Sequence, residues 1–214
     1  MAKSPAIEVL LIRSGETDWD DAERLQGETD LPMSESGREA MAALTRSLAE
    51  QPLETIYCGP DEASLETARL LAEQTGARVR KIPDLAEMRL GLWEGLREAE
   101  LLERYPKAYQ QWREDPTSVT PPEGDTLLAV AERTLAAAEK ALERSQRGAV
   151  AFVLRPIVRS VLAAALQQRS LASIWKLREQ LAPVERFRVA SGDLFTRAAT
   201  NAERTESDEP LTGA

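Results

Sequence analysis

The sequence predicts an α/β protein with a mainly parallel sheet that helices cover on both faces. Residues 7–12 and 149–154 are almost wholly apolar, as expected of strands that are buried on both sides. Shorter strand-like segments alternate with amphipathic helical segments, which is the pattern of α/β folds. The chain has 214 residues, enough for one sizeable core and few for two ordinary domains. We therefore expect one domain over residues 1–201.

The first half of the chain predicts three strands and two helices. Strand 7–12 ends at a charged, glycine-containing turn, and residues 18–33 hold too few apolar side chains for anything but a loop. The segment Ser34-Glu35-Ser36-Gly37 opens a helix that runs to about residue 49. The other expected elements are a strand at 54–57, a helix at 61–74 that Gly76 stops, and a strand at 78–82.

The second half begins with irregular residues 84–96 and a helical region, 97–114, that Pro106 breaks. A proline-containing loop, 116–124, precedes a long Ala- and Leu-rich helix at 125–144. Strand 149–154 follows, and Pro156 fits the first turn of the next helix. Residues 183–195 read as a closing hairpin around 191–193. The acidic tail 202–214 has almost no apolar residues, so we expect it to be disordered.

Composition excludes several classes of function. A net charge of −9 argues against nucleic acid as a partner, because phosphate backbones attract basic surfaces. Cys58 is the single cysteine and the chain has no histidine, so we expect no internal disulfide, no metal site and no cofactor. The N-terminus lacks a long apolar stretch, which predicts a cytoplasmic protein without a signal peptide or membrane span.

The candidate site lies where the first strand ends. Arg13 and Ser14 directly follow the apolar run, and ligands of α/β proteins are held at the carboxyl ends of strands. The sequence Leu-Ile-Arg-Ser-Gly-Glu-Thr at 11–17 resembles the Arg-His-Gly-Glu-Thr signature of the histidine phosphatase superfamily, the phosphoglycerate-mutase-like enzymes. Further stretches resemble that family in the same order, which makes the likeness far more specific than one motif: 25–27, 31–37, 56–68, 85–95 and 121–126. The resemblance implies a three-layer α/β/α sandwich.

The resemblance also assigns roles to positions. In the family two arginines and two histidines hold a phosphoryl group, and one histidine is the nucleophile. Arg13 matches the first arginine, Ser14 the nucleophile, Ala63 the second arginine and Leu154 the second histidine. Glu87 matches the proton donor of many members, and Asp20 matches an asparagine. Arg155, one residue beyond the lost histidine, is a candidate to restore a positive charge.

These losses predict a protein that does not catalyse phosphoryl transfer. Serine is a poor nucleophile without a base, and no imidazole exists in this chain. Ala63 and Leu154 remove donors that would stabilise the transition state, at roughly 3–4 kcal/mol for each donor. We expect no catalytic residue and a degenerate pocket that binds a small anion or a phosphorylated metabolite through these residues: Arg13, Ser14, Glu16, Gln26, Glu87 and Arg155.

Two alternatives remain open at this point. One is a diverged phosphatase or mutase that uses Ser14 or a water activated by Glu87. The other is a structural protein that binds a protein partner, or a second copy of itself, through an apolar surface such as 125–144 or 161–166.

Overall fold

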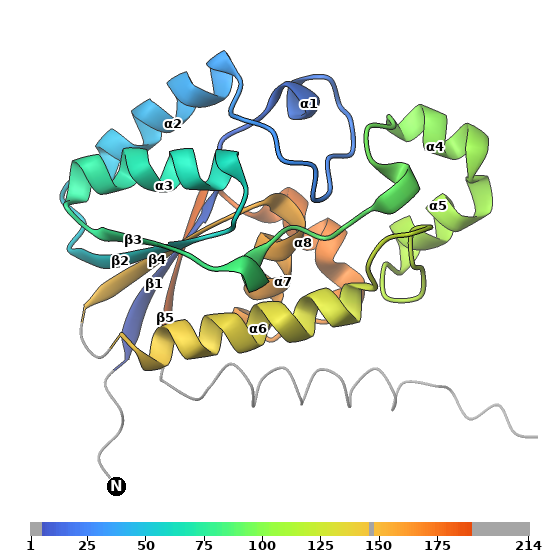
Figure 1. Cartoon of the computed structure of the whole chain (residues 1–214). Coiled ribbons are helices and arrows are strands. Elements are labelled where there is room, and N and C mark those ends of the chain that lie inside the picture. The colour runs from blue at the N-terminus through green and yellow to red at the C-terminus, as the bar shows by residue number, and fades with distance from the viewer. Residues whose placement is uncertain (1–5, 146–147, 190–214) are drawn as a thin grey trace, which may run out of the picture.

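A computed structural model of the protein describes residues 6–145 and 148–189. It has one five-stranded sheet with the strand order β3-β2-β4-β1-β5 (Figure 1). Four strands are parallel, and β5 lies antiparallel to β1 at one edge. The strands are β1 (Ile7–Arg13), β2 (Leu53–Cys58), β3 (Arg78–Lys81), β4 (Ala149–Leu154) and β5 (Val184–Val189).

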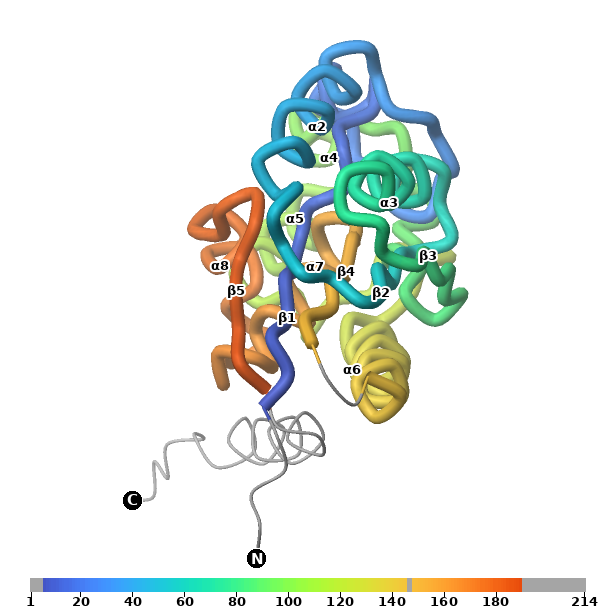
Figure 2. The backbone as a smooth tube through the Cα atoms, turned by 90° about the vertical axis from the view of Figure 1, so that its left-hand side faces the viewer, coloured from blue at the N-terminus to red at the C-terminus, as the bar shows by residue number. Residues whose placement is uncertain are grey.

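Helices lie on both faces of this sheet (Figures 1 and 2). Side chains alternate along each strand, so the core forms two clusters, one on each face. Leu10 and Ile12 pack toward α2 and α3, whereas Val9 and Leu11 pack toward α6 and α7. The predicted three-layer α/β fold with a mainly parallel sheet is therefore confirmed. The α-helices are α1 (Asp18–Asp21), α2 (Glu35–Ser47), α3 (Glu62–Thr75), α4 (Glu98–Arg104), α5 (Pro106–Glu114), α6 (Leu127–Glu143), α7 (Pro156–Leu166) and α8 (Ile174–Gln180); the short 3₁₀ turns are Pro83–Leu85, Gly91–Trp93 and Leu171–Ser173.

Local signals set the helix ends as the sequence predicted. The Ser34 side chain accepts a hydrogen bond from the Gly37 amide and caps α2, and Gly76 ends α3 in the left-handed conformation. Pro106 separates α4 from α5, and Pro156 opens α7.

Three expectations need correction or fall outside the described residues. Residues 18–33 are not all loop, because Thr17 and Asp20 cap one another reciprocally and hold the short helix α1. The stretch 161–166 is no exposed surface, because every residue of α7 is buried. The first half of the expected hairpin is β5, and residues 190–195 and the tail 202–214 lie outside the described residues. None of the described helices has the length and apolar character needed to cross a membrane.

A pair of glycine substitutions tests the close approach of the turn at Gly91 to the loop at Pro122. Gly91 has a φ of +53°, and a Cβ there would overlap the carbonyl oxygen of Pro122. We expect Gly91→Ala to lower the free energy of unfolding by more than about 2 kcal/mol, as left-handed strain and a backbone clash add. Urea denaturation of the wild type and the variant measures this difference in the free energy of unfolding. Gly76→Ala is the control, because Gly76 has a φ of +72° but nothing within 4 Å. Equal losses in the two variants would contradict the clash.

Candidate functional site

Three parallel strands end at the same edge of the sheet and bring their following loops together. The Ser14 amide donates to the carbonyl oxygen of Leu154 at 3.0 Å, and the Gly59 amide donates to that of Val153 at 3.2 Å. The segments after β1, β2 and β4 are thereby held side by side, at the edge where α/β proteins bind ligands.

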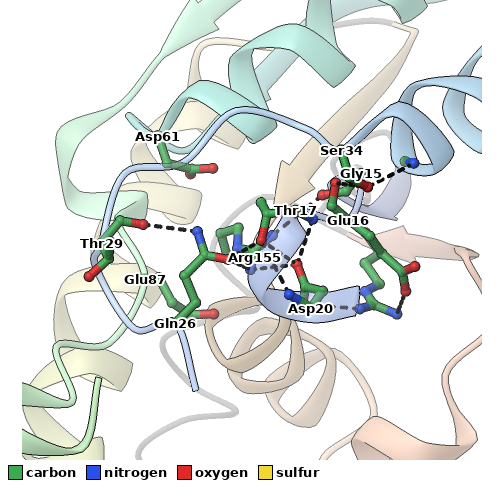
Figure 3. A network of polar contacts seen from close by, with 12 residues as sticks. Gly15, Glu16, Thr17, Asp20, Gln26, Thr29, Ser34, Asp61, Glu87 and Arg155 are labelled. Carbon is green, nitrogen blue, oxygen red and sulfur yellow. Dashed lines mark hydrogen bonds and ion pairs between the residues drawn. The ribbon is translucent and has the colours of Figure 1, made fainter. Parts of the chain in front are cut away.

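Arg155 lies at the centre of this edge, with 3% of its surface exposed (Figure 3). Its Nη2 donates to Asp20 Oδ2 at 3.1 Å and to Gln26 Oε1, and its Nη1 donates to the carbonyl oxygen of Gly15 at 3.4 Å. Its Nε has no acceptor among the described residues. The guanidinium is thus occupied mainly by acceptors of the chain itself.

Asp20 is the main charge partner of this arginine. Burial alone would raise the pKa of Asp20, but the charge of Arg155, the amide of Thr17 and the charge of Arg13 together hold the pKa below its ordinary value of 3.8. Arg13 is half-buried and lies 3.6 Å from Asp20 Oδ1 and 3.1 Å from Glu16 Oε1. Both cations that the sequence singled out are therefore paired with carboxylates.

Glu87 is buried against the N-terminus of α7. Its Oε2 accepts from the Ile157 amide at 2.8 Å, and its Oε1 accepts from the amides of Val158 at 3.1 Å and Met88 at 2.7 Å. Burial raises the pKa of Glu87, while these three donors and the charge of Arg155 act in the opposite direction. Since a helix N-terminus is a natural anion site, the carboxylate of Glu87 fills a position that an external anion would otherwise take.

The three positions that the resemblance marked as degenerate lie beneath the site or beside it. Ser14 is 1% exposed, and its hydroxyl has no partner among the described residues. Ala63 is fully buried in α3. Leu154 points into the core that faces α6 and α7. Because neighbouring residues of a strand face opposite sides, the side chain that reaches the site from the end of β4 is that of Arg155 and not that of Leu154.

A cavity of about 230 Å³, here called the strand-end pocket, lies beside Arg155. Of the residues that the sequence singled out, Gln26, Glu87 and Arg155 line it, whereas Arg13 and Glu16 do not. Its charged lining consists of one arginine, Arg155, and four acidic residues: Glu28, Asp30, Asp61 and Glu87. Within residues 6–145 and 148–189, no three Cys, Asp or Glu side chains are grouped so that they could hold a metal ion.

Asp61 is a pocket residue that the sequence analysis did not identify. Its Oδ1 accepts from the Ser64 amide at 2.9 Å and caps α3, and its Oδ2 is buried without a partner among the described residues. Asp61 follows the end of β2, so the strand-end rule that selected Arg13 would also have selected it.

Comparison with known proteins decides the family. The family model for the histidine phosphatase superfamily (branch 1) matches residues 9–201. The chain belongs to the histidine phosphatase superfamily. The chain nevertheless contains no histidine, so the side chain that gives the superfamily its name is missing from all 214 residues.

Individual relatives carry the names of phosphatases. Phosphoserine phosphatase 1 of Hydrogenobacter thermophilus is 28% identical over 169 residues, which are 79% of this chain and 80% of that protein. Glucosyl-3-phosphoglycerate phosphatase of Mycobacterium tuberculosis is 34% identical over 126 residues, 59% of this chain and 56% of the relative. Among solved structures, Bacillus stearothermophilus YhfR superposes with a TM-score of 0.75 at 29% identity and covers 79% of this chain and 84% of its own.

Removal of the central cation tests how the site is held together. We expect Arg155→Met to lower the free energy of unfolding at pH 7 by about 3 kcal/mol, because Asp20 and Gln26 lose their buried partner. Urea denaturation at pH 7 gives the value. Arg186→Met is the matched control, since Arg186 forms an exposed ion pair with Glu8 at 3.4 Å, and its loss should stay below about 1 kcal/mol. Similar losses in both variants would contradict a buried, integral role for Arg155.

The pKa of Asp20 predicts how this stability depends on pH. A carboxyl group whose pKa is lower in the folded state stabilises the protein above its unfolded pKa and loses that effect as the pH falls through the folded pKa. We therefore expect the part of the wild-type stability that depends on Asp20 to decline only below about pH 4. In Arg155→Met burial raises the Asp20 pKa, so the gap between its unfolded and folded values closes and the Asp20-linked loss of stability at low pH shrinks or reverses. An NMR titration that follows the side-chain carboxyl carbon of Asp20 in both proteins measures its pKa. An unchanged Asp20 pKa in Arg155→Met would refute the electrostatic coupling between Asp20 and Arg155.

Proposed function

We propose that this chain is a non-catalytic member of the histidine phosphatase superfamily, kept for binding and not for turnover of a phosphoester. The single observation that carries the proposal is the charge of the strand-end pocket, where four carboxylates accompany one arginine that is already paired. A phosphoester dianion would meet repulsion there, whereas phosphoryl transfer depends on fixed positive charge around the transferring group.

The side chains needed for catalysis are either absent from the chain or already hydrogen-bonded to other groups of the protein. A phosphohistidine intermediate is impossible in a chain without histidine. By the family resemblance, Ser14 and Ala63 stand where the nucleophile and a second arginine would be. Ser14 has no base in hydrogen-bond contact, and both oxygens of Glu87 accept backbone amides. Neither side chain is arranged to attack phosphorus or to activate a water.

The names of the relatives favour the second candidate, a diverged phosphatase, more than they favour an inactive protein. The compared proteins include a phosphoserine phosphatase and a glucosyl-3-phosphoglycerate phosphatase, and the chain spans most of the length of the first. In that case this chain would hydrolyse a phosphoester with a water or with Ser14. The mechanism would differ from that of a histidine nucleophile, since the residue itself is missing.

A phosphate-release assay separates the two candidates. The purified full chain is incubated with p-nitrophenyl phosphate, phosphoserine and glucosyl-3-phosphoglycerate, with the Hydrogenobacter enzyme as positive control. We expect release no faster than in buffer, because the nucleophilic histidine is missing and both arginines of the site are already paired with carboxylates.

Ser14→Ala and Glu87→Gln decide what any observed activity means. Turnover by the wild type that either substitution abolishes would overturn the proposal and establish the diverged phosphatase. Release that neither substitution changes would still overturn the proposal if it stays with the protein at constant specific activity through repeated purification; release that purification removes comes from a contaminant and leaves the expected result in place.

A further inference from the structure

A second, larger cavity lies on the other side of the Arg155–Asp20 ion pair. Its volume is about 590 Å³, within the range of roughly 300–1,000 Å³ that is typical of small-molecule sites. Segments of the β1–α1 region, α4, α5 and α8 line it, and we call it the α8 cavity. It shares no lining residue with the strand-end pocket: Arg155 lines that pocket, and Asp20 lines the α8 cavity.

Aromatic residues make one wall of the α8 cavity rigid. The Trp175 indole N–H donates to the carbonyl oxygen of Trp112 at 2.7 Å, and the two rings lie with their centroids 4.3 Å apart. These contacts fix α8 against α5. The indole N–H of Trp112 itself is buried and has no acceptor among the described residues. Tyr109, Leu25 and both tryptophans give the lining an apolar component.

Within the described residues most charges that line the α8 cavity are paired, but Arg178 is not. Arg13 pairs with Glu16 and Asp20, and Arg113 lies 3.9 Å from Glu179. Among residues 6–145 and 148–189, no hydrogen bond or ion pair engages the guanidinium of Arg178.

The environment of Arg178 is that of a cation inside a concave site. The residue is exposed to solvent, yet desolvation by the surrounding protein is the main influence and lowers its pKa. The charges that act on it are those of Glu87 and Asp20, which raise the pKa, and of Arg13 and Arg155, which lower it. An exposed but partly desolvated arginine without a partner is suited to bind an anion that enters the cavity.

We propose that the α8 cavity binds a small organic monocarboxylate with an apolar body, whose carboxylate pairs with Arg178. A planar carboxylate matches the fork of a guanidinium, and the aromatic wall offers apolar contact. A phosphate dianion fits less well, because its second charge would need a second free cation. The other arginines of the lining are engaged: Arg13, Arg24 and Arg113 pair with carboxylates, and Arg97 donates to the Ala22 carbonyl oxygen. The proposal does not depend on whether the strand-end pocket is catalytic.

Calorimetric titration of the full chain with 2-naphthoate tests the site. We expect binding to the wild type, and binding at least about tenfold weaker to Arg178→Gln, because the charged hydrogen bonds are lost. The uncharged 2-naphthamide should bind the wild type about tenfold more weakly than 2-naphthoate does. Lys176→Gln is the matched control on α8, exposed and outside the cavity lining, and it should bind as the wild type does.

Proton–nitrogen NMR spectra keep the test decisive if affinity is low. 2-Naphthoate should shift the indole N–H resonances of Trp112 and Trp175 in the wild type and not in Arg178→Gln. Absence of binding and of these shifts in the wild type would overturn the proposal, as would unchanged binding to Arg178→Gln. Tighter binding of 2-naphthyl phosphate, lost in Arg155→Met and kept in Arg178→Gln, would place the ligand in the strand-end pocket and also overturn it.

Discussion

The buried guanidinium of Arg155 is the constraint on which the site depends. It stands at the end of a central strand with 3% exposure, where an unpaired positive charge would be very costly. The surrounding residues supply acceptors for its two terminal nitrogens: the Asp20 carboxylate, the Gln26 amide oxygen and the Gly15 carbonyl oxygen. Each of these acceptors is held by further contacts, such as the Thr17 hydroxyl on Gln26 at 2.7 Å. The loop after β1 therefore takes its shape around this one cation.

Satisfying Arg155 in this way changes what the edge of the sheet can do. Parallel strands and the N-terminus of a following helix make this edge an anion site in general. Here the anions belong to the chain itself, because Asp20 pairs with Arg155 and Glu87 accepts the first amides of α7. The result is a polar cluster in which the cation is already paired and is not free to bind an external anion. The internal ion pair that stabilises the fold at this position therefore lowers the affinity of the site for an external dianion.

The Arg155–Asp20 ion pair lies between two cavities that differ in their chemistry, because Arg155 lines one and Asp20 lines the other. The strand-end pocket has a single paired cation among four carboxylates. The α8 cavity has balanced charges, an aromatic wall and Arg178, whose guanidinium has no partner in the part of the chain that the structure describes. Superfamily membership describes the scaffold that both share, and it does not fix which cavity is used. In our proposals the catalytic function has lapsed at the first and a binding function lies at the second.

The order of the elements could be predicted because it follows from local information. Apolar runs of strand length, the caps at Ser34 and Gly76, and Pro156 in a first helical turn act within a few residues of one another. The short helix α1 escaped prediction because its capping box lies in a polar stretch without apolar periodicity. The absence of histidine was also a property of the sequence alone, and it excluded a phosphohistidine whatever the fold.

The partners of the charged residues were decided by tertiary structure. Sequence order placed Arg155 near the site but gave no sign that its acceptors lie 129 and 135 residues away, at Gln26 and Asp20. Nor did it indicate that Arg13 would line one cavity and Arg155 the other, or that α8 would bring Arg178 beside them. The physical reason is the range of the forces. Helix and strand propensities act between neighbours in the chain, whereas charge pairing and desolvation depend on distances that exist only after the sheet has formed.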